Sequence, residues 1–220
     1  AKDAYWLLAE SYAELKDEEN AIQYYRLIVK EYPTSDIACD ATYRLAHHLQ
    51  TKGDLKEASR YYGTVVANFP DNKLAPAALF ASAVCLHKLG NFEGATRDWA
   101  MLIQKYPADP LVEEACYQKG LAETRLKKDN EAVLSFRNLV QKFPKSKFLA
   151  DAHYWLGMLF KEAGKLKESE EELRLALQSS PAKEIDRETQ FQLAVLLQKK
   201  GKLEESAGLW RYTPDHLLHL

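Results

Sequence analysis

The chain has 220 residues, of which 46% are hydrophobic and 28% charged, a balance typical of folded globular proteins and not of disordered ones. Its formal net charge is only −2 with acidic and basic residues interspersed, which gives neither a basic surface for nucleic acid nor a polybasic membrane anchor. The most apolar stretch, 148–160, contains an aspartate and a histidine and is too short to cross a bilayer, so we expect no membrane insertion.

Prolines recur along the chain at a fixed spacing of 37 residues. Four of the five follow an aromatic residue, and they stand at Pro33, Pro70, Pro107, Pro144 and Pro181. A fixed period of 20 to 50 residues is typical of stacked repeats, in which each unit buries its apolar face against its neighbours. Cutting after each proline predicts one array over 1–213, with units 1–33, 34–70, 71–107, 108–144, 145–181 and 182–213. Residues 214–220 are then a tail, a cap or the cut end of a longer array.

The first half of each unit is predicted to be an amphipathic helix, because its apolar residues lie three and four positions apart. In the second half a small residue precedes a bulky one by four positions, which predicts a second helix. Small residues recur in the first helix at Ala9, Ala46, Ala83, Gly120, Gly157 and Ala194, and bulky ones in the second at Tyr25, Tyr62, Trp99, Phe136, Leu173 and Trp210. We expect the small residues to let the bulky ones approach closely. A bulky residue at Gly157 would then cost about 1 to 3 kcal/mol.

The predicted helix ends agree with this division. A glycine, suited to a left-handed helix end, stands between the two halves of four units, at Gly53, Gly90, Gly164 and Gly201. Units one and four have Lys16 and Lys127 at that position. Each proline ends the second helix, because it has no N–H to donate to the next hydrogen bond. The helical pattern already runs at Ala1, so we expect the sequence to be a fragment or a processed chain.

This pattern resembles the tetratricopeptide repeat, with three extra residues per unit after the proline. The matching positions in the fifth unit are Leu156, Gly157, Phe160, Ser169, Leu173 and Pro181. The resemblance implies an all-α fold, a right-handed α-solenoid of about six helix-turn-helix repeats, and a non-enzymatic protein-protein interaction scaffold. The stretches YPTSDIACDATYRLA and KFPKSKFLADAHYWLG look like repeats of bacterial cell-envelope proteins, including the TolA-binding cell-division coordinator and relatives of outer-membrane assembly lipoproteins. That likeness favours the periplasm or cell envelope, with the cytoplasm as the alternative.

In arrays of this family the first helix of each repeat lines the concave wall, along which a peptide usually lies. Two columns of residues mark that helix. One is aromatic, Trp6, Tyr43, Phe80, Tyr117, Tyr154 and Phe191; the other, one turn earlier, is acidic, Asp3, Asp40, Glu114, Asp151 and Glu188. These columns suit an extended partner segment carrying Pro, Arg or Lys. The candidate partner-binding residues are Asp40, Tyr43, His47, Phe80, His87, Glu114, Tyr117, Asp151, Tyr154 and Glu188.

A structural interpretation of the same columns is equally physical. The aromatics would pack against the next repeat, and the acids would stabilise a first helical turn through the helix dipole. The next position on this face, Glu10, His47, Val84, Leu121, Met158 and Val195, is mostly apolar, which favours burial. A carboxylate clamp of the kind found in chaperone adaptors is not expected, because aromatics replace the Lys and Asn that it needs.

Catalytic, metal and cofactor sites are not expected. The sequence has no glycine-rich phosphate loop, no GxSxG and no HExxH. Its three cysteines, Cys39, Cys85 and Cys116, are widely spaced within predicted helices, which disfavours a disulfide framework or zinc site. His216 and His219 lack a third ligand, and His153 is predicted to be a partly buried histidine with its hydrogen bonds satisfied.

Two other functions remain open at this point. The aromatics could stack on sugar rings, as in a polysaccharide-binding or export-associated envelope component. Alternatively, the array could be a structural spacer that self-associates, since the ends of repeat arrays normally need a polar cap.

Overall fold

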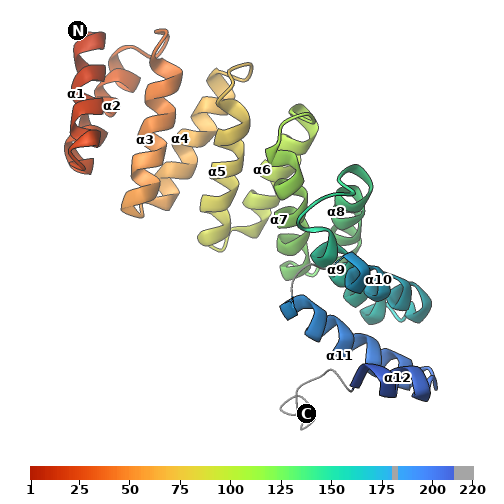
Figure 1. Ribbon diagram of the computed structural model, residues 1–220. Helices are drawn as coiled ribbons and strands as arrows, with labels where there is room; N and C mark the ends of the chain where they lie inside the picture. The colour runs from red at the N-terminus through yellow and green to blue at the C-terminus, as the bar shows by residue number, and fades with distance from the viewer. Residues whose placement is uncertain (180–182, 211–220) are drawn as a thin grey trace. The chain divides into compact units, whose positions relative to one another are not determined.

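The computed structural model describes residues 1–179 and 183–210, and the side chains of 1–179 and 187–209. The described residues form twelve helices and no strand (Figure 1). The helices are α1 Lys2–Glu14, α2 Glu18–Glu31, α3 Ala38–Lys52, α4 Leu55–Asn68, α5 Ala75–Lys88, α6 Phe92–Lys105, α7 Leu111–Arg125, α8 Asp129–Lys142, α9 Leu149–Glu162, α10 Leu166–Ser179, α11 Lys183–Lys199 and α12 Leu203–Trp210. This number of helices is consistent with about six helix-turn-helix repeats, which confirms the predicted fold class.

The helices fall into two compact units. The first unit is Ala1–Leu126, which holds α1 to α7, and the second is Lys127–Leu220, which holds α8 to α12. Within each unit every helix packs against the next one in sequence, and α5 also contacts α7. The unit boundary lies in the turn between α7 and α8, inside the fourth repeat. The single array over 1–213 therefore stays a prediction, and the tail 214–220 lies outside the described residues.

The turns between paired helices depend on a left-handed residue. Gly53, Gly90, Gly164 and Gly201 have φ between 73° and 94°, and Lys16 and Lys127 take the same conformation with φ of 60° and 58°. A side chain disfavours this conformation, which is why glycine holds it in the other four repeats. The second helices α2, α4, α6 and α8 end at the aromatic residue before the proline, as predicted. Pro181 lies outside the described residues.

The core forms where the small and bulky columns meet. Ala9, Ala46, Ala83 and Ala194 are fully buried, and so are the opposed Tyr25, Phe136 and Leu173. At Gly157 the approach is closest, because an added Cβ would lie 2.7 Å from the Leu173 Cγ atom. The Ser169 hydroxyl also donates a hydrogen bond of 2.8 Å to the Gly157 carbonyl. The predicted small-against-bulky packing is confirmed here; the Trp210 side chain lies outside the described residues.

The cysteine thiols are part of this core. Cys39, Cys85 and Cys116 are buried in α3, α5 and α7 of the first unit. Burial raises the pKa of the Cys39 and Cys85 thiols to about 11. These residues therefore act as small apolar side chains within helices. No helix in the described ranges combines the length and the apolar character that crossing a membrane requires.

Candidate partner-binding surface on the odd-numbered helices

The predicted partner-binding residues all lie on the odd-numbered helices, the first helix of each repeat. In the first unit, α3 holds Asp40, Tyr43 and His47, α5 holds Phe80 and His87, and α7 holds Glu114 and Tyr117. In the second unit, α9 holds Asp151 and Tyr154, and α11 holds Glu188. We use the name odd-helix face for these ten residues, of which seven belong to the first unit and three to the second.

Eight side chains of the odd-helix face are partly buried, and the other two, His47 and Glu188, are exposed. None of its ten side chains is fully buried, whereas Ala41, Leu45, Ala46 and Leu49 on the flanking positions of α3 are enclosed. The following column, which the sequence suggested was buried, is partly exposed at Val84, Leu121, Met158 and Val195 and fully exposed at His47. The face therefore offers acidic, aromatic and apolar groups that a partner can reach.

The aromatic side chains of the face are partly buried against the core and partly exposed to solvent. The Tyr43 ring meets Tyr62 edge-on at 5.4 Å between centroids. Trp6, which holds the same repeat position on α1 but is not one of the ten residues, meets Tyr25 at 5.8 Å in the same way. Tyr154 packs against the cluster formed by Leu173 and three leucines of α11. Burial, with a smaller effect of the Glu188 charge, raises the pKa of Tyr154 to about 12. One edge of each ring thus stabilises the repeat stack while another stays accessible.

The acidic column is not uniform. Asp40, Glu114 and Asp151 lie in the first turns of α3, α7 and α9, where the helix dipole favours a negative charge. Glu188 differs, because α11 already begins at Lys183 and places this carboxylate beyond the first turn. There it accepts a hydrogen bond of 2.8 Å from Gln192 Nε2. Helix-dipole stabilisation accounts for these three residues, and for Asp3 in the first turn of α1, but not for Glu188.

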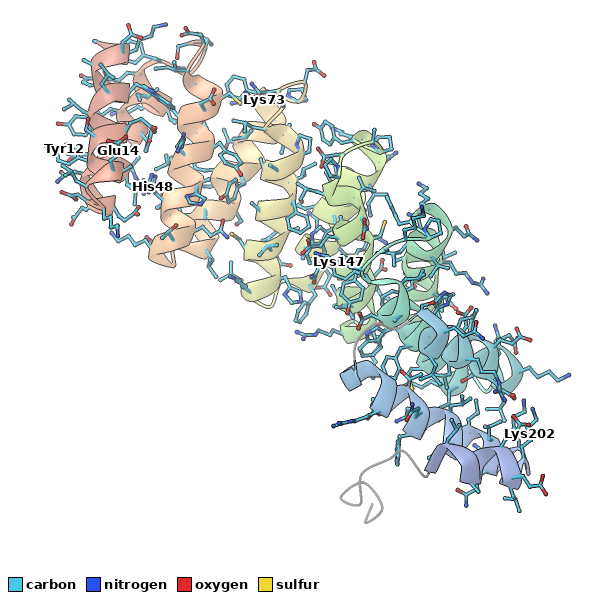
Figure 2. The ribbon with its side chains drawn as sticks, viewed as in Figure 1. Tyr12, Glu14, His48, Lys73, Lys147 and Lys202 are labelled. Carbon is cyan, nitrogen blue, oxygen red and sulfur yellow. The ribbon has the colours of Figure 1, made fainter. Side chains whose placement is uncertain are left out.

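The histidines have different surroundings. His47 is exposed, whereas His48, labelled in Figure 2, is buried, stacks on Tyr25 and pairs with Glu18. The His87 ring packs on Phe92 at 5.1 Å within its own repeat, and burial together with the Arg125 charge lowers its pKa. His153 is buried with Nδ1 2.7 Å from Glu172 Oε2, which confirms the predicted satisfied histidine.

The sequence analysis missed two features of the second unit, an ion cluster and a pocket. Buried Glu170 binds Arg174, Lys200 and Lys202 in the second unit; burial alone would raise its pKa, but these hydrogen bonds lower it to about 2. The other is a pocket between α8 and α9, whose lining includes Asp129, the first residue of α8. A sequence signal for this position is the aspartate itself, since the equivalents in four other repeats are Leu55, Phe92, Leu166 and Leu203, and only the first repeat also has an acid, Glu18.

The chain is similar to proteins built from tetratricopeptide repeats. Family profiles described as tetratricopeptide repeat match residues 3–35, 43–110, 114–146 and 150–183. Among solved structures, a tetratricopeptide repeat protein from Parabacteroides merdae is 21% identical with a TM-score of 0.64, over 94% of this chain and 77% of that one. Pseudomonas aeruginosa PilF is 18% identical with a TM-score of 0.60, over 94% and 88%.

A third solved structure is YrrB, described as a tetratricopeptide repeat protein with an unusual peptide-binding site. It is 19% identical with a TM-score of 0.62, over 90% of each chain. No curated protein matches the sequence. The structural likenesses concern the fold, and the family profiles together cover most of residues 3–183. This chain belongs to the tetratricopeptide repeat family.

Proposed function

We propose that the protein is a non-enzymatic interaction scaffold that binds an extended segment of a partner protein along the odd-helix face. Tetratricopeptide repeats and a solved neighbour described as having a peptide-binding site support a peptide ligand. The proposal includes the single array over 1–213 as the scaffold, and a place in the bacterial cell envelope, which rests on the sequence resemblance alone.

One observation carries this proposal. All ten residues of the odd-helix face keep solvent-accessible area, although the residues on both sides of Asp40, His47 and Asp151 in the sequence are buried. Half-buried tyrosines present rigid rings at little entropic cost, and the carboxylates beside them attract a cationic segment and orient it. The partner segment is therefore expected to carry Arg or Lys next to apolar residues or proline.

A pull-down with the full chain as bait tests the proposal. One variant reverses three charges of the face, Asp40→Lys, Glu114→Lys and Glu188→Lys. The matched control reverses three exposed acids on even-numbered helices, Glu31→Lys, Glu93→Lys and Glu171→Lys, with the same change in net charge. Glu93 lies in a first helical turn, as Asp40 and Glu114 do, so the loss of helix-dipole stabilisation is matched in part.

We expect a partner captured by the wild-type chain to be lost from the first variant and retained by the control. Its capture should also weaken as salt rises, because the charges are solvent-exposed. Both variants must keep the helical circular dichroism of the wild type. A partner retained by both variants, or lost from both, would overturn the proposal.

Self-association is a second candidate, supported by complementary ends. On α1, Leu8 is 39% exposed, whereas its equivalents Leu45 and Leu156 are enclosed. On α12, Leu203 is 64% exposed, whereas its equivalent Leu166 packs against the helix of the following repeat. A second copy could therefore place its α12 on α1. Mass measured by sedimentation equilibrium should then rise with concentration for the wild type and for the control Leu175→Glu, but not for Leu8→Glu. A constant wild-type mass would exclude this candidate.

A further inference from the structure

A pocket of about 280 Å³ opens between α8 and α9 in the second unit, next to the turn that follows α9. Its apolar lining includes Val133, Leu134 and Phe160. Phe160 is only 5% exposed, whereas Leu134 is 65% exposed. The pocket thus has an enclosed aromatic side chain in its lining and an exposed leucine beside it, an arrangement that favours burial of another apolar group.

Two cationic side chains lie over the Phe160 ring of this pocket. The Arg137 guanidinium carbon lies 5.3 Å from the Phe160 ring centroid, and Lys165 Nζ lies 5.9 Å from it. Contacts of this kind contribute about 0.5 to 1 kcal/mol each at exposed sites, so they hold both charges beside the pocket. Among the described residues, neither cation forms an ion pair. The lining also contains one carboxylate, Asp129, which leaves the charged side chains of the pocket with a net positive charge.

Arg137 has a glutamate, Glu168, at the repeat position where other arginines of its column form an ion pair, but it does not pair with this glutamate. At the same repeat position Arg26 pairs with Glu57, and Arg174 pairs with Glu205 at 2.5 Å. The repeat spacing offers Arg137 the carboxylate of Glu168 in the same way, yet in the described chain the guanidinium lies over Phe160 and not on Glu168. The cation therefore faces the pocket.

One lining position of the pocket differs from its equivalent in the third repeat. In the third repeat this position is Phe92, whose ring packs on His87 at 5.1 Å and lies under Arg125, at 5.5 Å from the guanidinium carbon. In the fourth repeat Asp129 stands at this position, at the start of α8, and lines the pocket. An aromatic ring placed there, as in the third repeat, would therefore compete for the pocket volume.

We propose that the α8–α9 pocket binds one apolar side chain, of leucine or phenylalanine size, from an acidic segment of a partner protein. The carboxylates on either side of that residue would meet Arg137 and Lys165. This site is separate from the odd-helix face and has the opposite charge preference. Failure of one proposal is therefore distinguishable from failure of the other.

Fluorescence anisotropy with labelled peptides on the full chain tests this inference. The probe is Gly-Asp-Glu-Leu-Phe-Asp-Glu-Gly; one comparison peptide replaces Leu-Phe with Ala-Ala, and another replaces every acid with Lys. We expect the probe to bind the wild type and the Ala-Ala peptide to bind at least about tenfold more weakly, because it loses apolar burial. The Lys peptide should not bind the pocket, because it loses the charge-assisted contacts with Arg137 and Lys165, so Asp129→Phe should not change any binding that it shows.

Three variants locate the binding. Asp129→Phe restores the third repeat's ring and should weaken the probe about tenfold or more, which corresponds to about 1.4 kcal/mol. This variant removes a negative charge, so electrostatics alone would strengthen binding of an acidic probe. Arg137→Glu with Lys165→Glu should abolish binding, whereas the control Lys142→Glu with Lys145→Glu, both exposed and outside the pocket lining, should keep most of it. Glu168→Gln should leave binding unchanged or stronger.

The inference is overturned if the wild type does not bind the probe at millimolar concentration. It is also overturned if Asp129→Phe binds the probe as tightly as the wild type while keeping its helical circular dichroism. Binding of the Lys peptide that Asp129→Phe leaves unchanged would instead support the odd-helix face.

Discussion

Replacement of Gly157 by alanine would test how closely the helix pairs pack. The new Cβ would lie 2.7 Å from Cγ and 2.9 Å from Cδ2 of Leu173, and 3.3 Å from its backbone nitrogen. Four other repeats have alanine at this position, where α2, α4 and α6 oppose it with the flat rings of Tyr25, Tyr62 and Trp99. Leucine branches at Cγ, next to the glycine, so this pair has no room for a methyl group.

Two effects of opposite sign decide the outcome. Alanine in a helix interior is more stable than glycine by about 0.5 to 1 kcal/mol. Overpacking of a dense core costs about 1 to 3 kcal/mol, and the rigid backbone nitrogen limits how far α10 can yield. The net expectation is a destabilisation of about 0.5 to 2 kcal/mol. Gly63→Ala is the matched control, because Gly63 lies within α4 with no atom near the new Cβ, and it should stabilise by about 0.5 to 1 kcal/mol.

Urea unfolding followed by far-UV circular dichroism measures both changes. The decisive comparison is the same substitution in a Leu173→Ala background, where the obstacle is gone and Gly157→Ala should become stabilising. The difference between the two backgrounds gives the coupling energy of the pair. A Gly157→Ala midpoint at or above that of the wild type, with no change in the second background, would refute the packing argument.

Three more predictions concern the helix ends and the ion cluster. Lys16→Gly should stabilise the chain by about 0.5 to 1 kcal/mol, because it relieves the positive φ of 60°; an unchanged or lower urea midpoint would contradict this. Asn91→Ala should lower the free energy of unfolding by about 0.5 to 2 kcal/mol, because the Asn91 side chain accepts a hydrogen bond of 3.0 Å from the Gly94 N–H at the start of α6. An unchanged free energy of unfolding would mean that the cap is dispensable. The lowered pKa of Glu170 contributes stability above pH 4.5 that is lost as the pH falls towards 2. A full shift corresponds to about 3 kcal/mol, and we expect about 1 to 2 because Arg174 and Lys202 are over 40% exposed; acid titration of Glu170→Gln should show a shallower loss, and an identical profile would contradict the assignment.

Much of the fold could be predicted because its determinants are local and repeated. The prolines, the left-handed glycines and the small residues facing bulky ones each act within one helix pair, and a single sequence shows them five, four and six times respectively. Even Lys16 and Lys127 could be assigned to left-handed turns from their register alone. The start of α11 could not be placed in this way, because Pro181 is not preceded by an aromatic residue and the acid at Glu188 suggested a first turn.

The surface was harder to predict than the fold, because exposure depends on which neighbours cover each position. Tyr154 is at once part of the core and accessible, an outcome that periodicity alone cannot give. The charge of the α8–α9 pocket depends on the direction taken by Arg137, whose guanidinium lies over Phe160. The pairs Arg26–Glu57 and Arg174–Glu205 did have a sequence signal, an arginine followed by a glutamate 31 residues later, which column comparison within helices does not reveal.

The positions of the three buried thiols make their chemical reactivity a measure of local unfolding in one part of the protein. All cysteines of the sequence lie in the first unit, and none lies in residues 127–220. The thiolate form of a cysteine reacts with a thiol reagent. In the folded helices, burial shields the thiols from the reagent and the raised pKa of Cys39 and Cys85 keeps them protonated. Labelling must therefore wait for a local opening, and its rate measures the free energy of opening for this half of the chain alone. Mass spectrometry of the wild-type protein, counting modified thiols over time, would thus separate the dynamics of one half from the other without any engineered probe.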